Sequence, residues 1–192
     1  MSFKASNIIT LPHESLRKRS RRVAVITDEI KQLIEDMKSA TVDWENGREH
    51  EVGVALAAVQ INSLFRVVII REDFNDKKNE NFEVFINPEV VKFEGDVEED
   101  FEGCLSVKDI YGKVPRHTKV RIKALNIEGR EIRLKAEGFL ARVFQHEIDH
   151  THGKLFVDHI KDNPDAFHKI NSSGKIEELS DAEKKDIFRI LW

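Results

Sequence analysis

The chain has 192 residues, of which 40% are hydrophobic and 34% charged, with a formal net charge of −4 and one cysteine. This composition is typical of a globular protein with a full core, and a single cysteine excludes an intramolecular disulfide framework. The negative charge argues against a nucleic-acid-binding protein held by bulk electrostatics. No apolar run reaches membrane-spanning length, and Met1 to Thr10 lacks the apolar core of a signal peptide, so we expect no contact with a membrane.

The first predicted elements are helical. The pattern over residues 13–20 favours a short helical turn. Thr27 can cap a longer helix over residues 28–42, because apolar side chains recur there at a spacing of three and four. Residues 43–51 are polar and include a glycine, so we expect a loop there.

Strands dominate the middle of the chain. Apolar runs at residues 65–70 and 82–87 predict two strands, and Pro88 is expected to end the second because proline cannot donate to a sheet ladder. In residues 120–124 and 132–136, apolar side chains alternate with basic ones. The Glu-Gly pair between these two segments predicts an antiparallel hairpin.

The predicted hairpin is followed by a helix that carries two histidines. Ser180 can cap a further short helix near the end of the chain. Successive strands with one amphipathic helix laid against them predict an α+β fold, in which antiparallel strands pack around the histidine-bearing helix.

The strongest chemical signal lies in that helix, in the segment Gln145-His146-Glu147-Ile148-Asp149-His150. At about 100° per residue, His146 and His150 project from one face and can reach the same metal ion. Glu147 can lean over that ion as a proton acceptor. This face is also apolar, so the ionisable groups face the core and need compensation there. A divalent cation provides it, and a buried hydrogen-bonded cluster is the alternative.

A catalytic site of the zinc type needs a third protein ligand and an open position for water. Phe156 stands where one large protease group has a third histidine, so that arrangement is excluded. His152 lies on the wrong side of the helix, and His159 follows Gly153, where the helix should end. Cys104 is the remaining candidate for the third ligand.

Three motifs that include these residues resemble those of the peptide deformylases. The first motif of that family is similar to Gly53-Val54-Ala55-Leu56-Ala57-Ala58-Val59-Gln60. The second matches Glu102-Gly103-Cys104-Leu105-Ser106, and the third matches the segment from Gln145 to His150. The resemblance extends over about residues 5–160. It implies a catalytic domain over residues 1–162, followed by a tail with a short helix over residues 163–192.

The resemblance implies a metal-dependent hydrolase. Cys104, His146 and His150 would bind one divalent ion, with Fe2+ expected and Zn2+ or Ni2+ able to occupy the site. Metal coordination can lower the pKa of water from about 16 towards about 7. Glu147 would accept the proton and later deliver it to the departing amine. The implied reaction removes the formyl group from the N-terminal formyl-methionine of new polypeptides and releases formate.

Further roles follow from the same resemblance. The Gln60 side-chain amide and the Leu105 backbone N–H are the implied donors to the oxyanion. The substrate backbone is expected to pair as an added strand near residues 54–55 and the segment after Leu105. The implied substrate-binding residues are Val54, Ala55, Gly103, Phe139 and Val143.

Two residues depart from the family motifs. Ala55 stands where a second glycine is usual, and its methyl group could narrow the substrate groove. Thr151 stands where leucine usually follows the third motif, which weakens a packing contact. Ala55 motivates one alternative, a metal-dependent amidase that acts on another N-acyl peptide. A non-catalytic, metal-stabilised module that binds nascent chains is the other alternative, although a structural metal needs neither Glu147 nor Gln60.

We also expect roles for two acidic residues in these motifs, and the resemblance implies partners and a location. Asp149 is expected to anchor a ligand histidine or the helix end, and Glu102 to hold nearby backbone or Arg116. By resemblance, formyl-methionyl peptides are the expected partners, with the ribosome near the nascent-chain exit as a further one. The expected location is a cytoplasm of bacterial type, with an organelle as the alternative.

Overall fold

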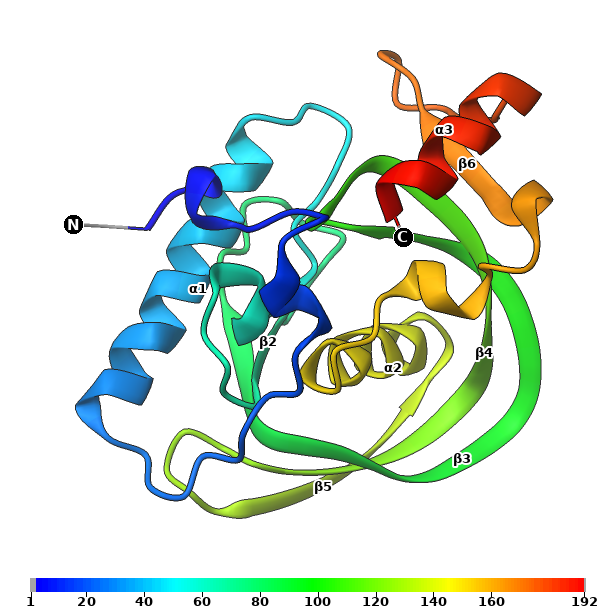
Figure 1. Ribbon diagram of the computed structural model, residues 1–192. Helices are drawn as coiled ribbons and strands as arrows, with labels where there is room; N and C mark the ends of the chain where they lie inside the picture. Colours follow the sequence, from blue (N-terminus) through cyan, green and yellow to red (C-terminus); the bar gives the residue numbers. More distant parts are fainter. Residues whose placement is uncertain (1–2, 192) are drawn as a thin grey trace.

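The computed structural model describes residues 3–191, in which a curved antiparallel sheet wraps around helix α2 (Figure 1). The strand order is β1-β2-β3-β4-β6-β7, and β5 pairs with β4 outside this path. This architecture confirms the predicted α+β fold. The elements are α1 (Asp28–Asn46), β1 (Ala55–Ala57), β2 (Val67–Arg71), β3 (Phe82–Cys104), β4 (Val107–Leu125), β5 (Glu131–Glu137), α2 (Gly138–Thr151), β6 (Phe167–Ile170), β7 (Ile176–Glu178) and α3 (Asp181–Leu191).

Strand β3 is far longer than expected, because Pro88 does not end it. The register shifts between Ile86 and Glu89, so the proline sits in an irregularity of the ladder. Asn87 adopts a φ of 54° there and donates its backbone N–H to the Arg66 carbonyl at 2.8 Å. The predicted end of the strand was therefore wrong. The continued strand forms, with β4, the long hairpin that curves around α2 (Figure 1).

Helix α1 also extends beyond its predicted end, into the segment expected to be a loop. Glu45 is buried in the last turn, and its carboxylate lies 2.7 Å from the Arg71 guanidinium. The Gly53 N–H donates to Glu45 Oε2 at 2.8 Å, and Arg71 Nε donates to the Gly53 carbonyl at 3.1 Å. A buried ion pair is stable only when further hydrogen bonds satisfy it. The helix extension thus fixes the backbone of Gly53, the first residue of the first family motif.

The core lies on both sides of β1 and β2. Side chains alternate between the two faces of a strand, so one set faces α2 and the other faces α1. Because helices cover both faces, β1 and residues 67–70 of β2 are apolar, and Arg71 at the end of β2 is the one charged residue in these two strands. The α2 side includes Ala57, Val68, Phe85, Val120 and Phe144, and the α1 side includes Ile34, Met37, Leu56, Ile69 and Ile86.

The sheet continues into the segment predicted to be a tail. Strand β6 pairs with residues 110–112 of β4, and β7 pairs with β6. The closing helix α3 begins after Ser180, whose hydroxyl accepts from the Glu183 N–H at 3.4 Å, as the predicted cap requires. The boundary at residue 162 stays a prediction. No helix within residues 3–191 has the length and apolarity needed to cross a membrane.

Candidate active site

Three predicted ligands meet where the end of β3 approaches α2. Because the two histidines are one helical turn apart, their ring centroids lie 4.9 Å from each other. The Cys104 Sγ lies 3.3 Å from His150 Nε2. One donor atom from each of Cys104, His146 and His150 lies within 4.8 Å of the other two. The structure therefore brings together side chains that are more than 40 positions apart in the sequence.

The surroundings of this cluster suit a divalent cation. One sulfur and two imidazole nitrogens are donors that zinc, iron and nickel accept. Glu147 is 5% exposed, and its Oε2 has no hydrogen-bond partner among the described residues. A buried carboxylate oxygen without a partner is costly unless a cation or water compensates it. The residues present therefore fit a metal ion, with Glu147 beside it.

Burial also sets the protonation of two of these groups. It raises the pKa of Glu147 to about 7, so this carboxyl can both accept and release a proton near neutral pH. Burial, together with the nearby His146, holds the pKa of His150 well below its usual value. His150 is therefore neutral, which is the form that binds metals.

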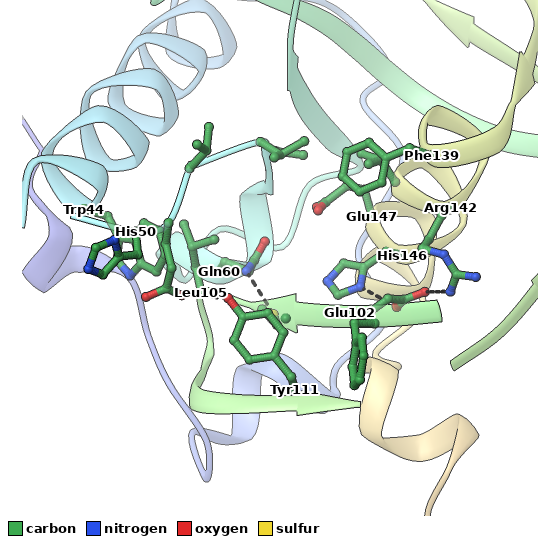
Figure 2. Close-up of a pocket in the computed structure, with 18 residues that line it drawn as sticks. Trp44, His50, Gln60, Glu102, Leu105, Tyr111, Phe139, Arg142, His146 and Glu147 are labelled. Atoms are coloured by element: carbon green, nitrogen blue, oxygen red, sulfur yellow. Dashed lines mark hydrogen bonds and ion pairs between the residues drawn. The ribbon is translucent and has the colours of Figure 1, made fainter. Parts of the chain in front are cut away.

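Glu102 orients His146, the first of the two predicted ligand histidines. Its Oε2 lies 2.9 Å from His146 Nδ1, which leaves the other ring nitrogen for the cluster. Arg116 Nε and Arg142 Nη1 each donate to Glu102 Oε1 at 2.9 Å. Burial alone would raise the pKa of Glu102, but the hydrogen bonds from His146 and Arg116 outweigh it and keep that pKa far below its usual value. Glu102 is therefore a buried, fully paired carboxylate (Figure 2).

The Asp149 side chain does not form its expected contact with a predicted ligand histidine or with the helix end within the described residues. The Asp149 carboxylate accepts from Arg116 at 2.6 Å and lies 2.7 Å from His159 Nε2. It therefore supports Arg116 rather than a ligand histidine. The predicted contact between Glu102 and Arg116 is confirmed, whereas its bond to His146 was missed.

Gln60 presents its amide to the same centre from a short helical turn, residues 58–61. Its Oε1 accepts from the Ala57 N–H at 2.8 Å, which fixes the orientation of the amide. Its Nε2 lies 3.6 Å from Cys104 Sγ and 3.2 Å from Ser106 Oγ. The amide nitrogen of Gln60 thus contacts one member of the cluster, Cys104 (Figure 2), and also Ser106, which lies outside the cluster. Ser106 is a neighbour that the sequence reasoning did not single out.

A cavity of about 290 Å³ opens from this centre. Its lining includes Glu147 and all five predicted substrate-binding residues, among them Phe139, which is 46% exposed. The Phe139 ring packs against Phe74 with centroids 5.0 Å apart. The sequence reasoning missed the other side of the cavity, which is lined by Trp44, His50, Glu51 and Tyr111.

Comparison with known proteins agrees with this geometry. The family model of polypeptide deformylases matches residues 5–165. The peptide deformylase of Thermomicrobium roseum is 42% identical over 158 residues, which are 81% of this chain and 85% of that protein. The Pseudomonas aeruginosa enzyme is 42% identical over 154 residues, which are 80% of this chain and 86% of that protein. The crystal structure of the Legionella pneumophila peptide deformylase has a TM-score of 0.73 at 36% identity, covering 98% of this chain and 92% of that one.

The chain belongs to the peptide deformylase family. The matched region contains all three motifs, so the resemblance predicted from the sequence is confirmed. In this deformylase, close packing explains why the second motif has a glycine at residue 103. A Cβ at Gly103 would lie 2.7 Å from the Tyr111 ring, which is the cross-strand neighbour of Gly103 in β4.

The two departures from the family motifs are both accommodated. Ala55 is buried, pairs with Ile70 in the sheet and also lines the cavity. Thr151 is buried as well, and its hydroxyl donates to the Ile148 carbonyl at 2.8 Å. That hydrogen bond removes the cost of a polar group at this position of the deformylase.

Replacing Glu102 with glutamine is expected to weaken metal binding by about 10- to 100-fold, because the ring orientation of His146 depends on this carboxylate. The measurement is competition for the metal against a chelator of known affinity, with circular dichroism as a check of folding. Glu94→Gln is the control, since Glu94 is also paired with basic residues but lies on the surface of the sheet. Equal metal affinities of the two variants would contradict the orienting role of Glu102.

Proposed function

We propose that this enzyme removes the formyl group from the N-terminal formyl-methionine of new polypeptides at the centre formed by Cys104, His146, His150 and Glu147. Membership of the deformylase family supports the reaction. The observation that carries the assignment of the site is the cluster of one sulfur and two imidazoles beside the buried carboxyl group of Glu147, whose Oε2 has no hydrogen-bond partner among the described residues. This cluster lies at a cavity that all three family motifs help to line.

Cys104, His146 and His150 would hold the divalent cation, which, when bound, lowers the pKa of water and polarises the substrate carbonyl. Glu147 takes the proton from the attacking water. It then returns this proton to the amine nitrogen as the C–N bond breaks, so formate and a free amino terminus result. Its raised pKa suits both transfers.

Two donors would stabilise the oxyanion of the tetrahedral intermediate. The Gln60 amide is held by Ala57, so its Nε2 is preorganised towards the centre. Leu105 opens the two-residue turn between Cys104 and Val107, where its backbone N–H lies next to the proposed ligand. Removing one donor of this kind typically costs about 3–4 kcal/mol of transition-state stabilisation.

The substrate would bind as an extended strand. Strand β1 is the first strand in the sheet order, so one of its edges carries no partner strand within the described residues. A peptide beside Val54 and Ala55 would therefore add to the sheet and place its reacting end at the cluster. The methionine side chain would enter the apolar part of the cavity near Val54, Phe139 and Val143.

The proposed metal is Fe2+, with Zn2+ or Ni2+ as substitutes, because the donor set suits all three. Contact with the ribosome and a cytoplasmic location stay predictions from the family resemblance.

The test compares formyl-Met-Ala with acetyl-Met-Ala, using anaerobically purified protein of measured metal content. We expect formate release, and acetate release at least about tenfold slower, because the site must accommodate an extra methyl group. Acetate release as fast as formate release would favour the alternative amidase. Absence of both products from metal-loaded protein would favour the non-catalytic binding module.

A further inference from the structure

Besides the predicted metal ligands, the cavity is lined by a rim of four side chains, Trp44, His50, Glu51 and Tyr111. Trp44 and His50 lie on the side opposite His146 (Figure 2), and Tyr111 is the cross-strand neighbour of Gly103. The Tyr111 hydroxyl donates to Glu51 Oε1 at 2.9 Å. Arg48 lies 2.5 Å from the second oxygen of Glu51, and its guanidinium stacks 4.5 Å from the centroid of the Trp44 ring. Three members of the rim are therefore held by one another and by Arg48. His50 is held differently.

His50 is supported by the C-terminal hairpin. The turn between β6 and β7 packs against it at Gly174, where a Cβ would lie 2.6 Å from His50 Cβ and 2.7 Å from its Cγ. Gly174 has a φ of +77°, a conformation that glycine adopts without strain. Glycine at this position therefore lets the turn lie directly on the base of the His50 side chain. The imidazole remains 45% exposed and lines the substrate cavity.

The turn between β6 and β7 is stabilised by hydrogen bonds from its backbone to the Asn171 side chain. Asn171 Oδ1 accepts from the Ser173 N–H at 2.9 Å and from the Lys175 N–H at 3.0 Å. The hairpin is also anchored to one member of the rim, because His168 of β6 pairs with Tyr111 of β4. The hairpin, the rim and His50 thus form one connected unit, although they come from distant parts of the sequence.

The position of this unit suggests what it recognises. In the proposed binding mode, the formyl-methionine occupies the part of the cavity near Val54, Phe139 and Val143. The following residues of the peptide would then leave past the rim, which lines the other side. Each residue of an extended peptide advances the chain by about 3.3 Å, so a dipeptide is much shorter than a tetrapeptide along this path. Only the longer peptide has residues available for contacts outside the inner cavity.

We propose that the Asn171–Gly174 turn acts as a positioning element for substrate recognition. By holding His50 at the rim, it lets the imidazole contact the peptide beyond its second residue and favours longer substrates. This inference rests on the proposed deformylase activity. It gives the C-terminal segment a role in the substrate range of the enzyme.

The test is the ratio of kcat/KM for formyl-Met-Ala-Ala-Ala to kcat/KM for formyl-Met-Ala. A Cβ at residue 174 would overlap the base of the His50 side chain, so Gly174→Ala must push His50 and the turn apart. We expect this change to lower the ratio about fivefold, mainly through KM for the longer peptide. His50→Ala should lower the ratio to a similar extent. The double variant should be no worse than His50→Ala, because both changes act through the same side chain.

Gly129→Ala is the matched control. Gly129 also has a φ of +77°, but its added Cβ would meet only Ile26 Cδ1 at an ordinary 3.6 Å. It carries the same backbone strain on the distant β4–β5 turn and should leave the ratio unchanged. Equal ratios for Gly174→Ala and Gly129→Ala, in protein that releases formate from the dipeptide, would overturn this inference alone. Failure of the unmodified enzyme to release formate from either peptide would overturn the proposed function together with it.

Discussion

Replacing Glu147 with glutamine is expected to lower kcat for formate release by about 10²- to 10⁴-fold while the protein keeps its metal. The amide is nearly the same size as the carboxylate but can neither accept the proton of the attacking water nor return it to the leaving amine. The three ligand side chains are unchanged, so metal content per chain should stay the same. The measurements are kcat on formyl-Met-Ala and metal content of the same sample.

The structure also predicts the effect of this substitution on stability. Glu147 Oε2 is buried and has no hydrogen-bond partner in the part of the chain that the structure describes, so the carboxylate does not stabilise the fold through that oxygen. The midpoint of thermal unfolding of Glu147→Gln should therefore be no lower than that of the unmodified protein. Glu137→Gln, an exposed change just before α2, serves as the control. Turnover of Glu147→Gln within tenfold of the control would exclude Glu147 as the proton acceptor.

Replacing Cys104 with alanine should have an equally large effect, through loss of the metal. Two imidazoles alone are a weaker site than two imidazoles with a thiolate, and the chain has no second cysteine to take its place. We expect metal content far below one ion per chain and formate release close to background. Cys104→Ser keeps the size of the side chain but offers a poorer donor, so it should retain less metal than the unmodified protein.

One experimental result would contradict the assignment of Cys104 as a metal ligand. If Cys104→Ala keeps one ion per chain and its turnover, the sulfur is not a ligand. Ser180→Ala is a useful control because it removes a hydroxyl that caps α3, away from the cavity. Its metal content and kcat should match those of the unmodified protein.

Local patterns in the sequence predicted the parts of the site that depend on neighbouring residues. The spacing of His146 and His150 on a helix follows from helical geometry, and their ring contact in α2 agrees with it. The hairpin of β4 and β5 followed from alternation around a glycine turn, and its register agrees with that pattern. The fold class followed from the order of these elements.

Features that depend on distant residues could not be predicted in this way. The last turn of α1 is stabilised by the buried pair of Glu45 and Arg71, which are 26 positions apart. Strand β3 continues past Pro88 because its pairing with β4 shifts register there, and this irregularity cannot be read from the residues around the proline. Glu102 binds His146 across 44 positions, so no local pattern distinguished it from Asp149.

The claim that the sulfur of Cys104 shares one cation with His146 and His150 can be measured directly. Metal-free protein is titrated with Co2+ without oxygen while its absorption spectrum is recorded. The structure predicts saturation at one Co2+ per chain, with a thiolate-to-cobalt charge-transfer band that only Cys104 can supply, because it is the one cysteine of the chain. Saturation without that band, or no binding of Co2+ at all, would contradict the proposed centre.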